Sequence, residues 1–97
     1  MFNKGTVDGL KQSIVFFNRA VQEDREYALA HDGLADAYAE LGREHSLPPE
    51  EAFSKAKEEA AAALAINPDL AEAHITLGEV LASHWDWKGA ETELQLD

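Results

Sequence analysis

The most informative segment of this chain occurs twice. Residues 19–31 read RAVQEDREYALAH and residues 62–74 read AALAINPDLAEAH, and the two align without a gap at an offset of 43 residues. Four residues of the first copy recur unchanged in the second: Ala20, Ala28, Ala30 and His31 return as Ala63, Ala71, Ala73 and His74. Self-similarity at a fixed period of about 20–50 residues is typical of repeat proteins, in which each unit packs on the next.

Each copy leads into a segment with the period of an amphipathic helix. Positions spaced three, four and three residues apart share one helix face, and both copies have such a set: Ala28, His31, Ala35 and Tyr38, then Ala71, His74, Gly78 and Leu81. Small residues at Ala35 and Gly78 let a neighbouring helix approach closely. We therefore expect closely packed antiparallel helices.

The rest of the chain extends this pattern to five helices and no strand. Apolar residues spaced four, three and four apart within 10–21 indicate a helix that starts near Thr6, its expected N-cap. Pro49 and the Asn67-Pro68 break mark two further helix starts, and Asp86 is the expected N-cap of a last helix. The predicted helices span about residues 6–23, 28–42, 49–66, 69–83 and 86–97.

Several of these residues resemble the tetratricopeptide repeat, a helix-turn-helix unit with small and large residues at set positions. Leu77-Gly78 resembles the Leu-Gly pair of its first helix, and Ala63 before Asn67-Pro68 resembles its closing Ala and Pro. The Leu-Pro-Pro segment 47–49, with Asp86-Trp87 further on, is similar to the tetratricopeptide regions of bacterial winged-helix regulators and signalling proteins.

The resemblance implies an all-α fold of antiparallel helix-turn-helix repeats coiled into a right-handed superhelix. Residues 1–97 would form a single domain, in which 7–24 is the second helix of a partial repeat, 28–66 is a full repeat with an insertion near 43–53, and 69–97 is a third, truncated repeat. It also implies a protein-protein interaction module or scaffold.

Composition limits the functions that this chain can have. It has 97 residues, a formal net charge of −11 and no Cys. A domain this small has little room for a catalytic cleft beside its core, and its negative charge disfavours nucleic acid and anionic membranes as partners. No apolar run has the length of a signal peptide or a membrane span, so we expect a cytoplasmic location.

The sequence contains no pattern of catalytic or metal-binding residues. None of the four His stands four residues from another on one helix, as a zinc protease site requires, and no Ser lies in a nucleophile motif. We therefore expect no enzyme activity, metal or cofactor. His31 and His74 are expected to pack between helices, while His45 and His84 are expected on the surface.

In tetratricopeptide proteins the first helix of each repeat lines a concave groove, and the resemblance implies such a groove here. The expected groove residues lie on the outward faces of 28–42 and 71–83: Leu29, Asp32, Asp36, Glu40, Glu72, Ile75, Glu79 and Ser83. Acidic residues with two apolar contacts suit a basic peptide or protein partner. The alternative is that these acids form a solvated helix face with no partner.

A second hypothesis is that the chain associates with itself. Val15 and Phe16 fall outside the apolar stripe of the first helix and give it an apolar flank. Such a flank favours a homodimer, with or without exchange of helices between copies. Trp85 and Trp87 are candidates either for anchoring a partner or for packing at the turn between two helices.

Overall fold

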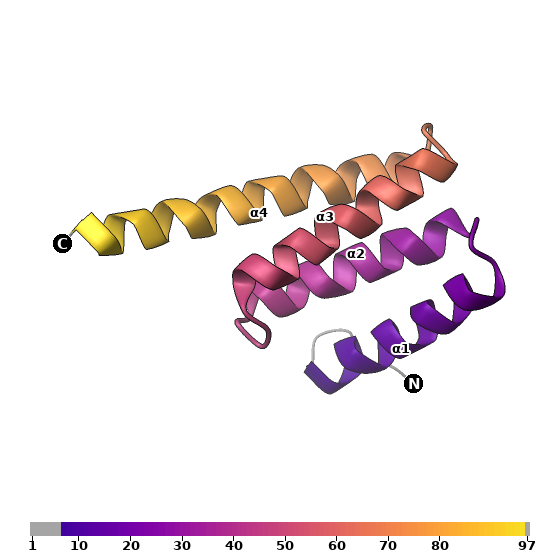
Figure 1. Cartoon of the computed structure of the whole chain (residues 1–97), viewed down its shortest axis with the longest axis horizontal. Helices are drawn as coiled ribbons and strands as arrows, with labels where there is room; N and C mark the ends of the chain where they lie inside the picture. Colours follow the sequence, from indigo (N-terminus) through magenta and orange to yellow (C-terminus); the bar gives the residue numbers. More distant parts are fainter. Residues whose placement is uncertain (1–6, 97) are drawn as a thin grey trace.

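The computed structural model describes the backbone of residues 7–96 and the side chains of residues 8–89. This part of the chain forms four helices: α1 (Val7–Glu23), α2 (Ala28–Arg43), α3 (Pro49–Ile66) and α4 (Ala71–Leu96) (Figure 1). Successive helices run antiparallel, and no strand occurs between residues 7 and 96. The predicted all-α class and the antiparallel packing are confirmed.

Helix α2 lies at the centre of the fold. It packs against α1, α3 and α4, and α4 also packs against α3, whereas α1 contacts α2 alone among the described helices. Figure 1 accordingly shows α1 and α4 on opposite sides of α2. This position explains why α2 has buried residues on more than one face: Leu34 and Leu41 lie on one, and Ala35 and Ala39 lie on another.

Large apolar side chains of α1 fit against smaller residues of α2. Leu10 is buried in a cluster with Ala37 and Leu41. The ring of Phe17 lies so close to Gly33 that a Cβ there would come within 2.5 Å of the ring carbon Cζ. Burial of a Leu or Phe side chain contributes about 2 kcal/mol, so these contacts hold α1 against α2.

Helix α3 contacts its neighbours through alanine. A stripe of residues that are each at most 1 % exposed runs along it: Ala52, Ala56, Ala60 and Ala63. Ala56 packs in one cluster with Ala39 of α2 and Val80 of α4, so three helices meet there. Side chains this short let the helix axes approach closely. The alanine-rich segment therefore forms the interior of the fold.

The turns that precede α2 and α4 contain the same hydrogen bonds, 43 residues apart. In both turns the first N–H after the preceding helix donates to the carbonyl oxygen four residues back, at 2.9 Å. The side chains of Asp24 and Asn67 then accept from the backbone N–H two residues on, at 3.0 and 3.2 Å. The sequence duplication is thus also a duplication of turn geometry. The turn takes the same form with Arg25 in the first copy and Pro68 at the equivalent position in the second.

The predicted helix break between residues 83 and 86 is wrong, and the described residues form four helices where five were predicted. Helix α4 continues without interruption, so Asp86 lies inside a helix and not at an N-cap. His84 and Trp87 stack with their ring centres 6.2 Å apart, and the His84 ring packs against Phe53 of α3. This packing favours a continued helix, and no Pro or Gly stands between Gly78 and Gly89 to interrupt it.

The other predicted boundaries lie close to the observed ones. Helix α2 ends at Arg43, α3 begins at Pro49, and α4 begins at Ala71. The insertion expected near 43–53 covers the end of α2, the connection to α3 and the first turn of α3. Thr6, the expected first N-cap, lies outside the described residues.

Candidate protein-binding site

The predicted groove residues lie on two helices that pack against each other. Four stand on α2 and four on α4, and these helices are in contact. Leu29 on α2 is 48 % exposed and Ile75 on α4 is 62 % exposed. Of the polar members, Glu72 and Glu79 are exposed, and the others are half-buried: Asp32, Asp36, Glu40 and Ser83.

Arg43 joins two of these residues. Its Nε donates a hydrogen bond to the Ser83 hydroxyl oxygen at 3.0 Å, and its Nη1 forms an ion pair with the Glu40 carboxylate. Arg43 therefore ties the end of α2 to α4 and lowers the negative charge of the surface at this end. It is absent from the predicted set, although a basic residue three positions after Glu40 in the last turn of a helix is a recognisable signal.

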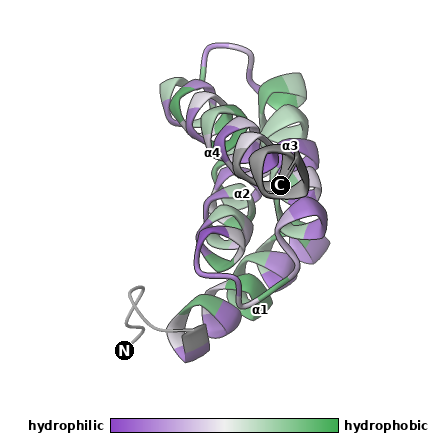
Figure 2. Ribbon diagram, turned by 90° about the vertical axis from the view of Figure 1, so that its left-hand side faces the viewer, coloured by the Kyte–Doolittle hydropathy of each residue, from purple (hydrophilic) through white to green (hydrophobic). Residues whose placement is uncertain are grey.

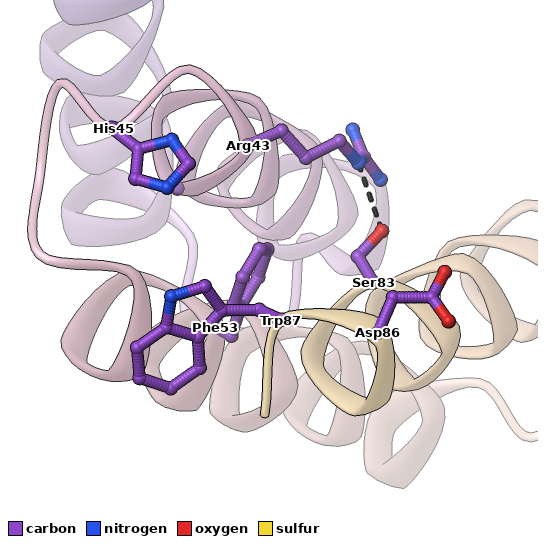
Figure 3. A pocket seen from close by; sticks show the side chains of 7 residues that line it. Arg43, His45, Phe53, Ser83, Asp86 and Trp87 are labelled. Carbon is purple, nitrogen blue, oxygen red and sulfur yellow. Dashed lines mark hydrogen bonds between the residues drawn. The ribbon is translucent and has the colours of Figure 1, made fainter. Parts of the chain in front are cut away.

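A cavity of ≈ 400 Å³ opens beside Arg43, between the end of α2, the start of α3 and the middle of α4 (Figure 3). Ligand pockets in proteins have volumes of about 300–1,000 Å³, so this cavity has room for a small group or a side chain. Phe53 and Trp87 give it an aromatic wall, and Asp86 adds a carboxylate. The residues that line it are Gly42, Arg43, His45, Phe53, Ser83, Asp86 and Trp87.

His84 supports this aromatic wall from inside the protein. It is 6 % exposed, and its ring centre lies 5.6 Å from that of Phe53. Its Nε2 lies 2.9 Å from one carboxylate oxygen of Glu50, and Lys88 Nζ lies 3.8 Å from the other. The hydrogen bond with His84 holds the pKa of Glu50 below its usual value. The expected surface position of His84 is wrong, because the unbroken α4 turns this ring toward α3.

His45 follows α2 with a left-handed backbone, at φ 59°. Its N–H donates to the Gly42 carbonyl oxygen at 3.2 Å, and the Ser46 N–H donates to that of Leu41 at 3.0 Å, which is the Schellman pattern of a helix end. Glycine is the usual residue here, because a side chain in this conformation costs about 1 kcal/mol. The turn at the end of α2 therefore accounts for this conformation, and it places His45 in the lining of the cavity.

His31 and His74 make the same contact with the turn before their helix. Nε2 of His31 lies 3.2 Å from the Arg25 carbonyl oxygen, and Nε2 of His74 lies 2.7 Å from that of Pro68. His31 also reaches α3, where its Nδ1 lies 2.8 Å from Glu59 Oε1. The expected packing between helices fits His31, which is half-buried against α3, but it is wrong for His74, which is exposed.

Val15 and Phe16 form a separate apolar surface on α1. They are 60 % and 55 % exposed. Together with Gln12 and Arg19 they line a cavity of ≈ 280 Å³. Because α1 and α4 lie on opposite sides of α2, this surface is distinct from the one that α2 and α4 share (Figure 1).

Within residues 7–96, no three His, Asp or Glu side chains gather closely enough to hold a metal ion. In the same part of the chain, no helix combines the length and the apolar character needed to cross a bilayer.

Protein-family models, curated proteins and solved structures were compared with this chain, and none of them matches it. The resemblance to the tetratricopeptide repeat therefore rests on the residues quoted above.

Proposed function

We propose that this chain is a protein-binding module of the tetratricopeptide type, which holds a basic peptide or protein segment across α2 and α4. The observation that carries the proposal is a pair of contacting helices that each present an exposed apolar side chain among acidic ones. Leu29 is that residue on α2, and Ile75 is that residue on α4. A segment with Lys or Arg around one or two apolar residues complements both features.

The charge of the whole chain supports a basic partner. At a net charge of −11, long-range attraction raises the rate at which a basic segment encounters this surface. The same attraction is screened by salt. Binding should therefore weaken steadily as the ionic strength rises.

The two ends of the surface differ in chemistry. At one end, Arg43 neutralises Glu40 and the aromatic cavity offers a place for one apolar or aromatic side chain. At the other end, the first turn of α4 presents the exposed carboxylate of Glu72. We expect the bound segment to place an apolar residue near Trp87 and its basic residues nearer Glu72.

Peptide binding tests this proposal directly. Fluorescence anisotropy would compare a labelled helical peptide that carries Lys and Arg around Leu with the same peptide carrying Glu in place of the basic residues. Glu79→Lys should weaken binding of the basic peptide about tenfold, because an attraction becomes a repulsion. Glu58→Lys reverses an exposed acid on α3 and serves as the matched control. An equal loss of affinity in Glu79→Lys and Glu58→Lys, or equal binding of the basic and the acidic peptide, would contradict the proposal.

Self-association is a second candidate function, favoured by the exposure of Val15 and Phe16 around a cavity on α1. Monomeric proteins rarely leave a contiguous apolar patch uncovered without a use for it. Phe16→Glu should therefore yield monomers in light scattering, and an unchanged mass would count against this function.

No catalytic role is proposed. The Ser13 hydroxyl donates to the Gly9 carbonyl oxygen at 3.0 Å, and the Ser83 oxygen accepts from Arg43. The Ser13 hydroxyl thus bonds within α1, and the Ser83 hydroxyl joins α4 to α2.

A further inference from the structure

Helix α2 packs on α1 and on α3 with two different faces. Toward α1 it presents Gly33, which lies under the ring of Phe17, and Ala37, which packs with Leu10 in one cluster. Leu41 belongs to the same cluster. This is the first face of α2.

The second face of α2 meets α3. His31 binds Glu59, and the ring of Tyr38 has Lys55 Nζ 5.8 Å from its centre. Gly42 completes this face, since a Cβ there would lie 3.0 Å from the Cβ of Ala52.

Helix α4 repeats both faces 43 residues later, but only one of them is covered. The equivalents of Gly33, Ala37 and Leu41 are all buried: Thr76, Val80 and His84. The equivalents of His31, Tyr38 and Gly42 are all exposed, with Leu81 at 49 % and Trp85 at 78 %. The outer face of α4 is the set His74, Leu81 and Trp85.

Helix α1 repeats α3 at the same offset. Gln12 and Phe16 are the equivalents of Lys55 and Glu59, the residues with which α3 contacts Tyr38 and His31. On α1 these positions are exposed. The outer face of α1 is the set that lines the ≈ 280 Å³ cavity: Gln12, Val15, Phe16 and Arg19. Figure 2 shows hydrophobic residues along the middle of this helix.

We infer that the outer face of α4 in one copy of the chain packs on the outer face of α1 in a second copy, as α2 packs on α3 within each chain. Leu81 then lies beside Gln12, and His74 lies beside Phe16. The inference rests on the self-association proposed above and supplies its second surface. The peptide-binding proposal does not depend on it, because Leu29 and Ile75 belong to neither outer face.

The charges at the two ends of these faces are complementary. If α4 of one copy packs on α1 of the second copy as α2 packs on α3, the two helices are antiparallel, and the end of α1 meets the start of α4. Asp69 and Glu72 are exposed at that start and can pair with Arg19 of the other copy. At the other end, Lys11 approaches Asp86, and both are exposed. Two α1 helices packed on each other would instead bring these basic residues together. Charge therefore favours α4 over a second α1 as the occupant.

In this arrangement the outer face of α4 in one copy contacts the outer face of α1 in the next. Each time a copy is added, one outer face of α1 and one outer face of α4 therefore stay open at the two ends. Such head-to-tail contacts form rings or open filaments, whereas a two-fold dimer stops at two copies. Light scattering of the wild-type chain over a range of concentrations should show a mean mass that rises past twice the monomer. A chain that stays monomeric throughout would overturn both self-association and this inference.

Mixing two variants tests which faces meet. Phe16→Glu removes the outer face of α1 and leaves that of α4, and Leu81→Glu does the reverse. Each variant alone should be monomeric, while an equimolar mixture should form a dimer that grows no further. Rescue on mixing also shows that both variants fold. If association persists in Leu81→Glu, or if the mixture stays monomeric while the wild type associates, the inference fails and the wild-type result still stands for self-association.

Leu29→Glu provides the matched control, because Leu29 has the same 48–49 % exposure as Leu81 but lies on α2. It should associate like the wild type. In a Trp87→Phe background, Trp85 is the remaining indole, and its fluorescence should shift to the blue as concentration rises. An unshifted spectrum in associated samples would place the contact elsewhere and overturn the inference.

Discussion

Helices α2 and α4 start from the same sequence and the same turn, yet they have different surroundings. The turn before each contains identical hydrogen bonds, and each carries a His that reaches back to the carbonyl oxygen six residues before it. His31 also meets a glutamate of α3, whereas His74 is exposed. Local sequence therefore determines the turn and the helix, while the contacts of each side chain depend on which helices lie beside it.

The largest difference in the effect of a substitution on stability is expected between Leu34 and its equivalent Leu77. Leu34 is 1 % exposed between the helices, whereas Leu77 is half-buried. Leu34→Ala should lower the free energy of unfolding by about 3 kcal/mol, because it leaves a cavity in a packed core. Leu77→Ala should cost less than about 1.5 kcal/mol. Denaturant unfolding at low protein concentration would measure both, and equal losses would show that the two helices are equally covered.

Substitution of the two equivalent histidines, His31 and His74, should show a smaller difference in the loss of stability. His31→Ala removes contacts to both the Arg25 carbonyl and Glu59, and it should cost about 1–2 kcal/mol. His74→Ala removes the contact to Pro68 and should cost about 0.5 kcal/mol. Glu59→Gln keeps the hydrogen bond to His31 but removes the negative charge, so it measures how much of the Glu59 contact is due to charge. A larger loss at His74 would contradict the comparison.

A glycine on the open side of α4 allows the two helices to be made more alike. Gly78 occupies the position of the buried Ala35, and a Cβ at Gly78 would meet no atom within 4 Å. Gly78→Ala should stabilise the chain by about 0.5–1 kcal/mol through helix propensity. The control is Gly42→Ala, whose added Cβ would lie 3.0 Å from Ala52 and should give no such gain. Thermal unfolding would measure both.

The smallest effect concerns pH, at the point where buried His84 on α4 replaces buried Leu41 on α2. His84 lowers the pKa of Glu50 in the folded chain, so the unfolded chain takes up the proton first as the pH falls. This contribution to stability is complete above the usual glutamate pKa and is lost as the pH falls through the lowered value. The free energy of unfolding, measured at a series of acidic pH values, should depend less on pH in Glu50→Gln than in the wild type. Glu51→Gln, its exposed neighbour, should behave like the wild type.

The helices could be predicted from the sequence wherever local signals set their ends. Pro49 opens α3, and the Asn67-Pro68 turn separates α3 from α4, since proline disrupts the helix that precedes it. The break expected before Asp86 fails for the opposite reason. Its N-cap signal is local, but the packing of His84 and Trp87 near α3 outweighs it.

The candidate site could be predicted only in part. The acids and the two apolar residues on α2 and α4 follow from the resemblance to the tetratricopeptide repeat, which implies a groove along the first helix of each repeat. The contact of Arg43 with Ser83 joins residues 40 positions apart, and the left-handed His45 takes a conformation usually reserved for glycine. Neither feature has a local signature strong enough to reveal the cavity that both residues line.

The alanine stripe of α3 has a mechanical consequence for the surface that α2 and α4 share. Ala56 touches Ala39 of α2 and Val80 of α4, so a single methyl group separates α3 from both helices. Because α2 and α4 also contact each other, a heavier residue at Ala56 would push α3 away from both helices and disturb the contact between them. The spacing of α2 and α4 thus depends on a buried residue of α3 that lies behind the surface they share.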